Sequence, residues 1–215
     1  MIGRIDGFKF SPMSDNQVEE VSEIVSEAFC KFDPTCVASN LSYLEVKTFV
    51  DELLRRSLKQ KTTVVVENEE SNVVAGALIC EDLETEEFPL NIIDENKWGP
   101  ILDIVDKLDN FYKESISETP AKRVLHMFML AVRKDFSGHK LGENLIASAL
   151  NNAQQLGYDS AIAEATGPIS QHLFKKKNFR ELYKVDYQAY KTPEGHKPFT
   201  SIDSIDACRL LEYSF

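Results

Sequence analysis

The chain of 215 residues carries a formal net charge of -11, with 43% hydrophobic and 27% charged residues. This is the balance of a soluble globular protein, and the length suffices for one domain, residues 1–215, with a sizeable core. The negative charge argues against a general affinity for nucleic acid or anionic membrane, and it suits a cationic partner such as an amine.

Cysteine usage and hydropathy bear on the compartment. The four cysteines are Cys30, Cys36, Cys80 and Cys208. They form no Cys-x-x-Cys pair and have no histidine at metal-ligand spacing, so we expect reduced thiols and no metal site. The sequence shows neither a signal-peptide core nor a segment of membrane-spanning length. The predicted location is therefore cytoplasmic.

Residues 1–80 predict strands and helices in alternation. Ser14 is a suitable N-cap for a first helix, and Pro34 forces an extended conformation on Asp33 at its end. Ser42 precedes a second apolar stripe at helical spacing. The expected elements are a strand at 8–10, helices at 15–32 and 43–58, and a hairpin of strands at 62–67 and 73–80.

The segment 81–123 is longer than the connection of a hairpin requires. Apolar residues at helical spacing from Ile101 to Tyr112 predict an inserted helix, with Trp98-Gly99-Pro100 in front of it. We expect this helix either to cover a cleft or simply to pack on the sheet.

The most informative stretch is 124–157. The apolar run Val124–Val132 predicts a strand buried on both faces. A polar turn follows, and apolar residues then recur at helical spacing from Leu141 to Gly157, a suitable C-terminal cap. The free amides and the dipole at such a helix start form an anion site, although an ordinary strand-turn-helix without a ligand has the same pattern.

The C-terminal part continues the alternation. Asn178, which tolerates a left-handed turn, ends a short helix. The expected elements are a strand at 158–166, a helix at 170–177, and strands at 179–187 and 202–213. Together with the preceding elements, this order predicts a mixed sheet flanked by helices.

The turn at 137–142 resembles motif A of the GNAT acetyltransferases, whose loop usually reads Arg/Gln-x-x-Gly-x-Gly/Ala. Here the six residues are Ser137, Gly138, His139, Lys140, Leu141 and Gly142. Ser137 replaces the Arg/Gln and Lys140 replaces the middle glycine, while the last glycine is kept. The resemblance implies that the amides of this loop hold the pyrophosphate of acetyl-CoA.

Several further patches resemble the arylalkylamine N-acetyltransferase-like branch of insects and nematodes. They are Phe32-Asp33-Pro34, Trp98-Gly99-Pro100, the hydroxyl-bearing turn before Phe179, and the segment 186–191. The resemblance implies an α+β GNAT fold, with a central mixed sheet of about seven strands and a helical insertion at 81–123. It also implies acetyl transfer from acetyl-CoA to a primary amine by direct attack.

The family uses amides of its central strand to hold the pantetheine arm and the thioester oxygen. These positions fall on Met129, Leu130, Ala131 and Val132. For the base, the insect branch has a glutamate just before a proline, where this chain has Asp33, which is shorter and equally suited to brace the turn. His126 is the rival base, since it shares strand parity with Phe128, Leu130 and Val132, although a core role suits it too.

The position of the usual GNAT acid, a tyrosine, is occupied by Phe174. Instead, the insect branch has two hydroxyls four residues apart, and Thr166 and Ser170 stand at the matching places. Their role is either in the substrate and proton path or in capping the following helix.

The function predicted from these features is an acetyl-CoA-dependent N-acetyltransferase for a small amine, with an arylalkylamine as first choice. An acidic cleft would instead favour a polyamine, and an amino acid or a protein N-terminus are further alternatives. A GNAT scaffold that serves as a binding module without activity is the rival from another class, and the departures at Ser137, Lys140 and Phe174 support it.

Overall fold

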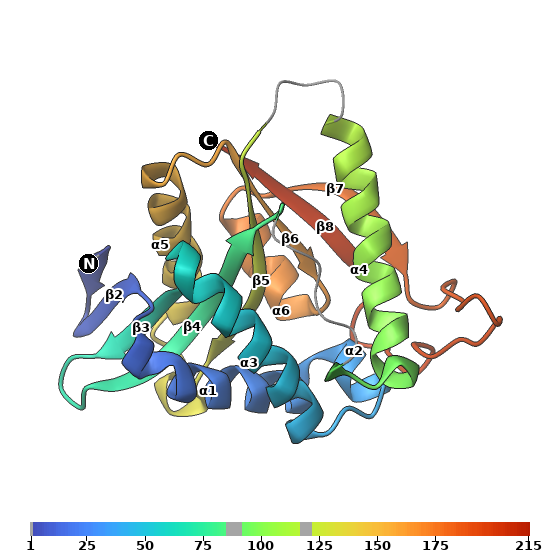
Figure 1. Ribbon diagram of the computed structural model, residues 1–215, viewed down its shortest axis with the longest axis horizontal. Coiled ribbons are helices and arrows are strands. Elements are labelled where there is room, and N and C mark those ends of the chain that lie inside the picture. Colours follow the sequence, from blue (N-terminus) through green and yellow to red (C-terminus); the bar gives the residue numbers. More distant parts are fainter. Residues whose placement is uncertain (1, 85–91, 117–121) are drawn as a thin grey trace.

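The computed structural model describes residues 2–84, 92–116 and 122–215. These residues form an eight-stranded sheet of order β1-β2-β3-β4-β5-β6-β8-β7 (Figure 1). The strands are β1 (Gly3–Ile5), β2 (Phe8–Pro12), β3 (Val64–Asn68), β4 (Val73–Asp82), β5 (Val124–Val132), β6 (Ser160–Ala165), β7 (Arg180–Asp186) and β8 (Ala207–Ser214). Neighbouring strands are antiparallel except for β5 and β6, which are parallel.

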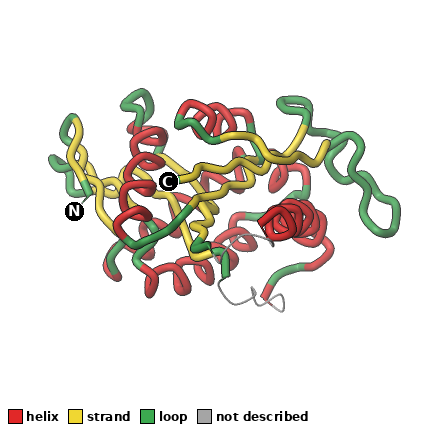
Figure 2. The backbone as a smooth tube through the Cα atoms, turned by 90° about the horizontal axis from the view of Figure 1, so that it is seen from above, coloured by secondary structure: helices red, strands yellow, loops and turns green. Residues whose placement is uncertain are grey.

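The described residues form six α-helices. Helices flank the sheet, as Figure 2 shows from above. They are α1 (Val18–Phe32), α2 (Pro34–Ala38), α3 (Tyr43–Gln60), α4 (Glu95–Ile116), α5 (Leu141–Gln155) and α6 (Pro168–Lys176). Apolar stripes of α1, α3 and α4 pack on one face of the sheet, and those of α5 and α6 pack on the other. The sheet is therefore buried on both faces, as its near-continuous apolar strands predict.

The mixed sheet flanked by helices is confirmed, with eight strands rather than about seven. The additional strand is β1, which pairs with β2 through the turn at Asp6 and Gly7, both in the left-handed region of φ. Its three residues are too few to show an alternating pattern of apolar and polar residues, so this strand could not be predicted from periodicity.

Three larger differences from the expected elements occur. Trp98-Gly99-Pro100 lies inside α4 rather than in front of it, because Asp94 accepts hydrogen bonds from the first amides and starts the helix earlier. A short helix, α2, follows Asp33 directly. The last strand begins at Ala207 and not at Ile202, which is buried in the preceding loop.

A bulge in β5 changes the direction of its side chains. Ile79 pairs with Met129 and Cys80 pairs with Met127, so Phe128 has no partner in β4. His126 and Phe128 lie against the α1/α3/α4 side, where their rings are 4.6 Å apart. Leu130 and Val132 face α5 instead. The prediction that His126 shares a face of the sheet with Leu130 and Val132 is therefore wrong, because the extra residue in the bulge reverses the alternation of side chains.

Candidate active site

The two parallel strands part in the middle of the sheet. Residues Val124–His126 of β5 pair with Ser160–Ile162 of β6, and the described pairing of these strands ends there. Beyond this point β5 continues beside β4 and β6 continues beside β8. At the opening lies a chamber of about 90 Å³, whose walls include Met127–Leu130 on one side and Glu164–Thr166 on the other.

Asp33 lies in the wall of this chamber, between α1 and α2. The carboxylate caps α2, with Oδ1 accepting hydrogen bonds from the amides of Thr35 (3.0 Å) and Cys36 (2.9 Å) and from the Thr35 hydroxyl (2.6 Å). Pro34 at the start of α2 fixes this turn, since its φ suits the first helical position. Oδ2 accepts a hydrogen bond from the Thr166 hydroxyl.

Thr166 and Ser170 also line the chamber, at the turn that joins β6 to α6. The Ser170 hydroxyl donates to the carbonyl of Gly167 (3.0 Å) and accepts from its amide (3.4 Å), and so closes the first turn of α6. The structure thus brings Asp33, Thr166 and Ser170 together. Phe174 completes the wall below them and supplies no hydroxyl.

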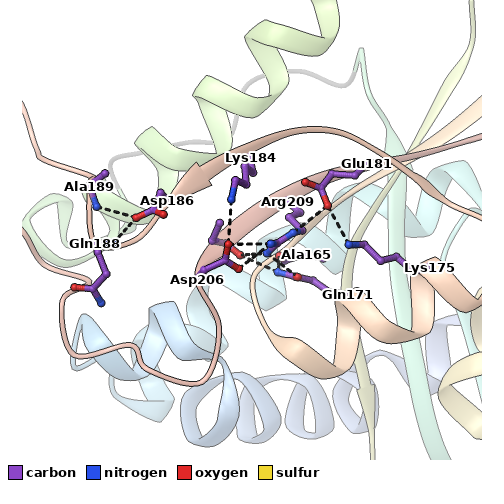
Figure 3. A network of polar contacts seen from close by, with 11 residues as sticks. Ala165, Gln171, Lys175, Glu181, Lys184, Asp186, Gln188, Ala189, Asp206 and Arg209 are labelled. Carbon is purple, nitrogen blue, oxygen red and sulfur yellow. Dashed lines mark hydrogen bonds and ion pairs between the residues drawn. The ribbon is translucent and has the colours of Figure 1, made fainter.

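Two side chains hold this turn in place (Figure 3). Gln171 is buried and donates hydrogen bonds to the carbonyls of Ala165 (3.0 Å) and Ala207 (2.8 Å), which ties α6 to the ends of β6 and β8. Arg209 in turn donates to the Gln171 side chain (2.9 Å) and pairs with Glu181 on β7 (3.0 Å). The residues at the chamber are therefore positioned by the C-terminal hairpin.

His126 does not line the chamber. The described residues place it in the wall of a neighbouring cleft of about 600 Å³, which shares Val105 and Phe128 with the chamber. The imidazole is 4% exposed and forms an ion pair with Glu164. Burial opposes its positive charge, but the carboxylates around it raise the pKa of His126 to about 9. An imidazole that is already protonated at neutral pH is not a base for the reaction.

The wide cleft is rich in carboxylates. Its walls include two basic side chains, Arg56 and Lys113, besides His126. Against these stand five acidic side chains, Glu81, Glu95, Asp103, Asp106 and Asp109. An excess of carboxylates in a cleft attracts cations.

The loop predicted to hold pyrophosphate is exposed at the start of α5. In the described part of the chain, no protein group accepts a hydrogen bond from the amides of residues 138–143. Lys140 has φ +56° and Gly138 has φ +86°. Lys140 thus adopts the left-handed conformation that glycine provides more easily, so replacing the family's glycine leaves the turn intact.

The central-strand residues divide between two environments. Met129 and Leu130 line the chamber, whereas the described lining contains neither Ala131 nor Val132. All four pair with β4, from Ile79↔Met129 to Gly76↔Val132. Gly76 allows this close pairing, because a Cβ there would lie 2.7 Å from the carbonyl oxygen of Ala131.

Three further side chains bear on the site: Glu164 and Asp109, which were not predicted from the sequence, and Trp98, which was noted as part of Trp98-Gly99-Pro100. Each carries a buried polar atom with no hydrogen-bond partner among the described residues, namely Oε1, Oδ1 and Nε1 respectively. Glu164 and Trp98 line the chamber, and Asp109 lines the cleft. Glu164, the single carboxylate in the apolar strand β6, was an available signal, because a buried charge needs a partner or a function. Asp109 gave no such signal, since it is one of several acidic residues in α4.

The described residues contain no group of three or more histidine, cysteine or acidic side chains arranged to hold a metal ion. The four cysteines are free thiols. Within the same residues, no helix has the length and apolar character needed to cross a membrane.

No protein-family model matches this chain. Similarity to solved structures is extensive in fold and low in sequence. Arylalkylamine N-acetyltransferase 2 from Aedes aegypti superposes with a TM-score of 0.83 at 18% identity, over 97% of this chain and 99% of that one. The C-terminal condensation domain of Ebony, in complex with beta-alanyl-dopamine, gives 0.81 at 15% identity, over 97% and 99%.

A polyamine N-acetyltransferase from Drosophila melanogaster, which forms N-acetylagmatine, gives a TM-score of 0.77 at 14% identity, over 97% of this chain and 100% of that one. These proteins share the sheet and the flanking helices over nearly the whole chain. The expected fold is thereby confirmed: this chain has the fold of the GNAT acetyltransferases, like the arylalkylamine N-acetyltransferases among them.

Proposed function

We propose that this protein is an acetyl-CoA-dependent N-acetyltransferase that acetylates a small primary amine by direct attack. The observation that carries the proposal is the chamber between the diverging strands β5 and β6, where Asp33, Thr166 and Ser170 meet. A buried carboxylate and two hydroxyls beside free strand edges suit a reaction that moves protons and stabilises an oxyanion.

The residues present fit acetyl-CoA. The unpaired amides of residues 138–143 at the start of α5 would hold the pyrophosphate, with the positive end of the helix dipole behind them. The β6-facing edge of Met129 and Leu130 would hold the pantetheine arm and the thioester oxygen, with Ala131 and Val132 continuing that edge toward the loop. When bound, acetyl-CoA supplies the activated acetyl group.

The chamber residues have distinct roles in this proposal. Asp33 holds the Thr166 hydroxyl toward the chamber, and the three hydrogen bonds on Oδ1 fix the carboxylate in this position. Ser170 stands one helical turn further and supplies a proton to the departing thiolate. His126 is not assigned a role as base, because it faces the other cavity and carries its own proton.

Acetyl-CoA binding measured by calorimetry tests the first half of the proposal. Gly142→Trp should abolish binding, since even a Cβ at this position would lie 3.0 Å from Leu173 and an indole would fill the pyrophosphate site. Gly3→Trp is the matched control, because a Cβ there meets nothing within 4 Å on the distant strand β1. Wild type and Gly3→Trp should bind in the micromolar range. No heat from millimolar acetyl-CoA would favour the binding-module alternative.

The identity of the amine substrate is the second half of the proposal. Phe29, Phe49 and Trp98 give the chamber apolar aromatic walls, with Phe49 and Trp98 stacked at 4.3 Å, and these suit the carbon skeleton of an arylalkylamine. The acidic side chains of the adjoining cleft support a second candidate, a polyamine whose distal ammonium lies there. Release of CoA with tryptamine, dopamine and tyramine, compared with spermidine, decides between the two.

A further inference from the structure

Glu164 is a charged residue in an otherwise apolar strand. Its side chain is 5% exposed and points with Ile162 and Thr166 to the α1/α4 side of the sheet, because alternate residues of a strand share a face. One oxygen, Oε2, pairs with His126, and the other, Oε1, has no hydrogen-bond donor among the described residues. A carboxylate oxygen buried in this way needs a proton or a hydrogen-bond donor beside it.

The partner on one side is a second carboxyl. Asp109 projects from α4 and is close enough to Glu164 for a hydrogen bond between the two side chains, and its own Oδ1 is also buried without a donor. Two carboxylates in contact cannot both ionise freely, so one proton is shared between them. The pair thus has a defined place for a proton.

The pair also spans the wall between the two cavities. Glu164 lines the chamber of about 90 Å³, and Asp109 lines the cleft of about 600 Å³. The chamber is where the amine must lose a proton before it attacks, and the cleft is wide enough to contain solvent. A proton taken up at Glu164 therefore has a route out through Asp109.

Asp33 is less suited to this task. Oδ1 already accepts three hydrogen bonds and Oδ2 accepts one, so little of its acceptor capacity is left for a substrate proton. We propose that Glu164 is the group that accepts the proton of the substrate amine, and that Asp109 relays this proton to the acidic cleft. This inference rests on the proposed function.

The step balances as follows. The substrate ammonium gives one proton to the Glu164 carboxylate, and the neutral nitrogen forms the C–N bond as the C–S bond breaks. The second nitrogen proton goes to the departing thiolate, through Ser170. Asp109 releases its resting proton to the solvent of the cleft, and Glu164 then returns to the carboxylate by passing the substrate proton to Asp109, which restores the resting pair. One proton leaves per turnover, in addition to the amide and the thiol.

The surrounding charges set the protonation states of the pair. Facing the pair are Glu81 on β4, His126 on β5, Lys113 on α4 and, beside Glu81 at 3.2 Å, Arg56 on α3. Burial and the charge of Glu164 raise the pKa of Asp109 to about 7. Burial also disfavours the charged form of Glu164, but His126 outweighs it and lowers the pKa of Glu164. At rest the proton of the pair belongs to Asp109, and Glu164 enters the reaction as a carboxylate.

The test is Glu164→Gln assayed with two amines. An alkylamine is an ammonium ion at neutral pH and needs a base, whereas trifluoroethylamine is weakly basic and is already neutral. We expect kcat/KM for the alkylamine to fall about 100-fold, the usual contribution of a general base, and that for trifluoroethylamine to change little. The rise of kcat/KM with pH through about 7 should also disappear in Glu164→Gln and shift in Asp109→Asn.

Glu212→Gln is the matched control, since Glu212 is another buried glutamate, 4% exposed and paired with Arg180 at 2.5 Å, on the neighbouring strand β8. Glu212→Gln should lower the stability of the protein and should affect kcat/KM equally for the two amines. Equal losses for both amines in Glu164→Gln, or a selective loss in Asp33→Asn instead, would overturn the assignment. If Glu164→Gln does not fold, Asp109→Asn serves as the test. A pH profile of kcat/KM like that of wild type would then overturn the assignment. An inactive wild type would refute the proposed function itself.

Discussion

At the scale of single residues, the candidate site is built from buried polar side chains that contact one another in specific groups. Asp33 joins Thr166, and Glu164 joins His126 and Asp109. The resemblance to the arylalkylamine N-acetyltransferase-like branch indicated Asp33, Thr166 and Ser170. The prediction that His126 shares a face of β5 with Leu130 and Val132 was wrong. The β5 bulge at Phe128 depends on pairing with β4, which no local pattern reveals.

Thr166→Val removes the hydroxyl that binds Asp33 while keeping the shape of the side chain. It leaves one carboxylate oxygen without its donor in a buried place, so we expect kcat/KM to fall by about 10- to 100-fold. Thr166→Ser retains the hydroxyl and should keep most of the activity. Steady-state kinetics with acetyl-CoA affinity measured in parallel would show this. A loss of acetyl-CoA binding in place of turnover would contradict the assigned role.

His126 gives stability a pH dependence. Its pKa is raised from 6.5 to about 9 in the folded protein. A raised histidine pKa contributes stability that is complete below 6.5 and is lost as the pH rises through about 9. Denaturant unfolding of wild type and His126→Gln should therefore differ most near pH 6. The difference should shrink by roughly 3 kcal/mol toward high pH. A difference independent of pH would mean that the imidazole is neutral in the fold.

At the scale of secondary structure elements, the turn between β6 and α6 is held by side chains from far along the chain. Gln171 bridges the carbonyls of Ala165 and Ala207, and Arg209 holds Gln171 (Figure 3). The helix α6 was predicted from residue 170 and begins at Pro168, and Asn178, with a φ of +65°, follows its end as predicted. The attachment of α6 was not predictable, because Gln171 and Arg209 meet only after β8 has paired with β6.

Gln171→Leu keeps the size of the side chain and leaves the carbonyl of Ala165 without this donor. We expect a loss of about 1–3 kcal/mol in the free energy of unfolding. We also expect a lower kcat, because the Thr166–Ser170 turn loses its anchor to β8. Urea unfolding and kinetics at saturating acetyl-CoA measure the two effects. Full activity at reduced stability would show that the turn does not depend on this anchor.

At the scale of the whole molecule, the order of elements was sufficient to predict the fold. The long apolar run of β5, the cap at Gly157 and the alternation of strands and helices define a sheet covered on both faces. The division into an apolar chamber and an acidic cleft was not predictable, because residues of α3, α4, β4 and β5 form the cleft jointly. Acidic side chains spread along the sequence became a patch only through packing.

The acidic cleft predicts a salt effect that depends on the substrate. A net charge of -11 and the acidic side chains of the cleft attract cations, and salt screens this attraction beyond about 8 Å at physiological ionic strength. Raising the salt concentration should lower kcat/KM more for spermidine than for tryptamine. Initial rates over a salt series test this, and equal slopes for the two amines would argue against binding of a distal ammonium in the cleft.

The most direct test of acetyl transfer is the stoichiometry of the products formed from acetyl-CoA and an amine. Free CoA thiol and N-acetylated amine, the latter identified by mass spectrometry, should appear in a one-to-one ratio with wild type and not with Gly142→Trp. If wild type binds acetyl-CoA and yet forms no acetylated product from any amine of the panel, this fold serves binding here and not catalysis.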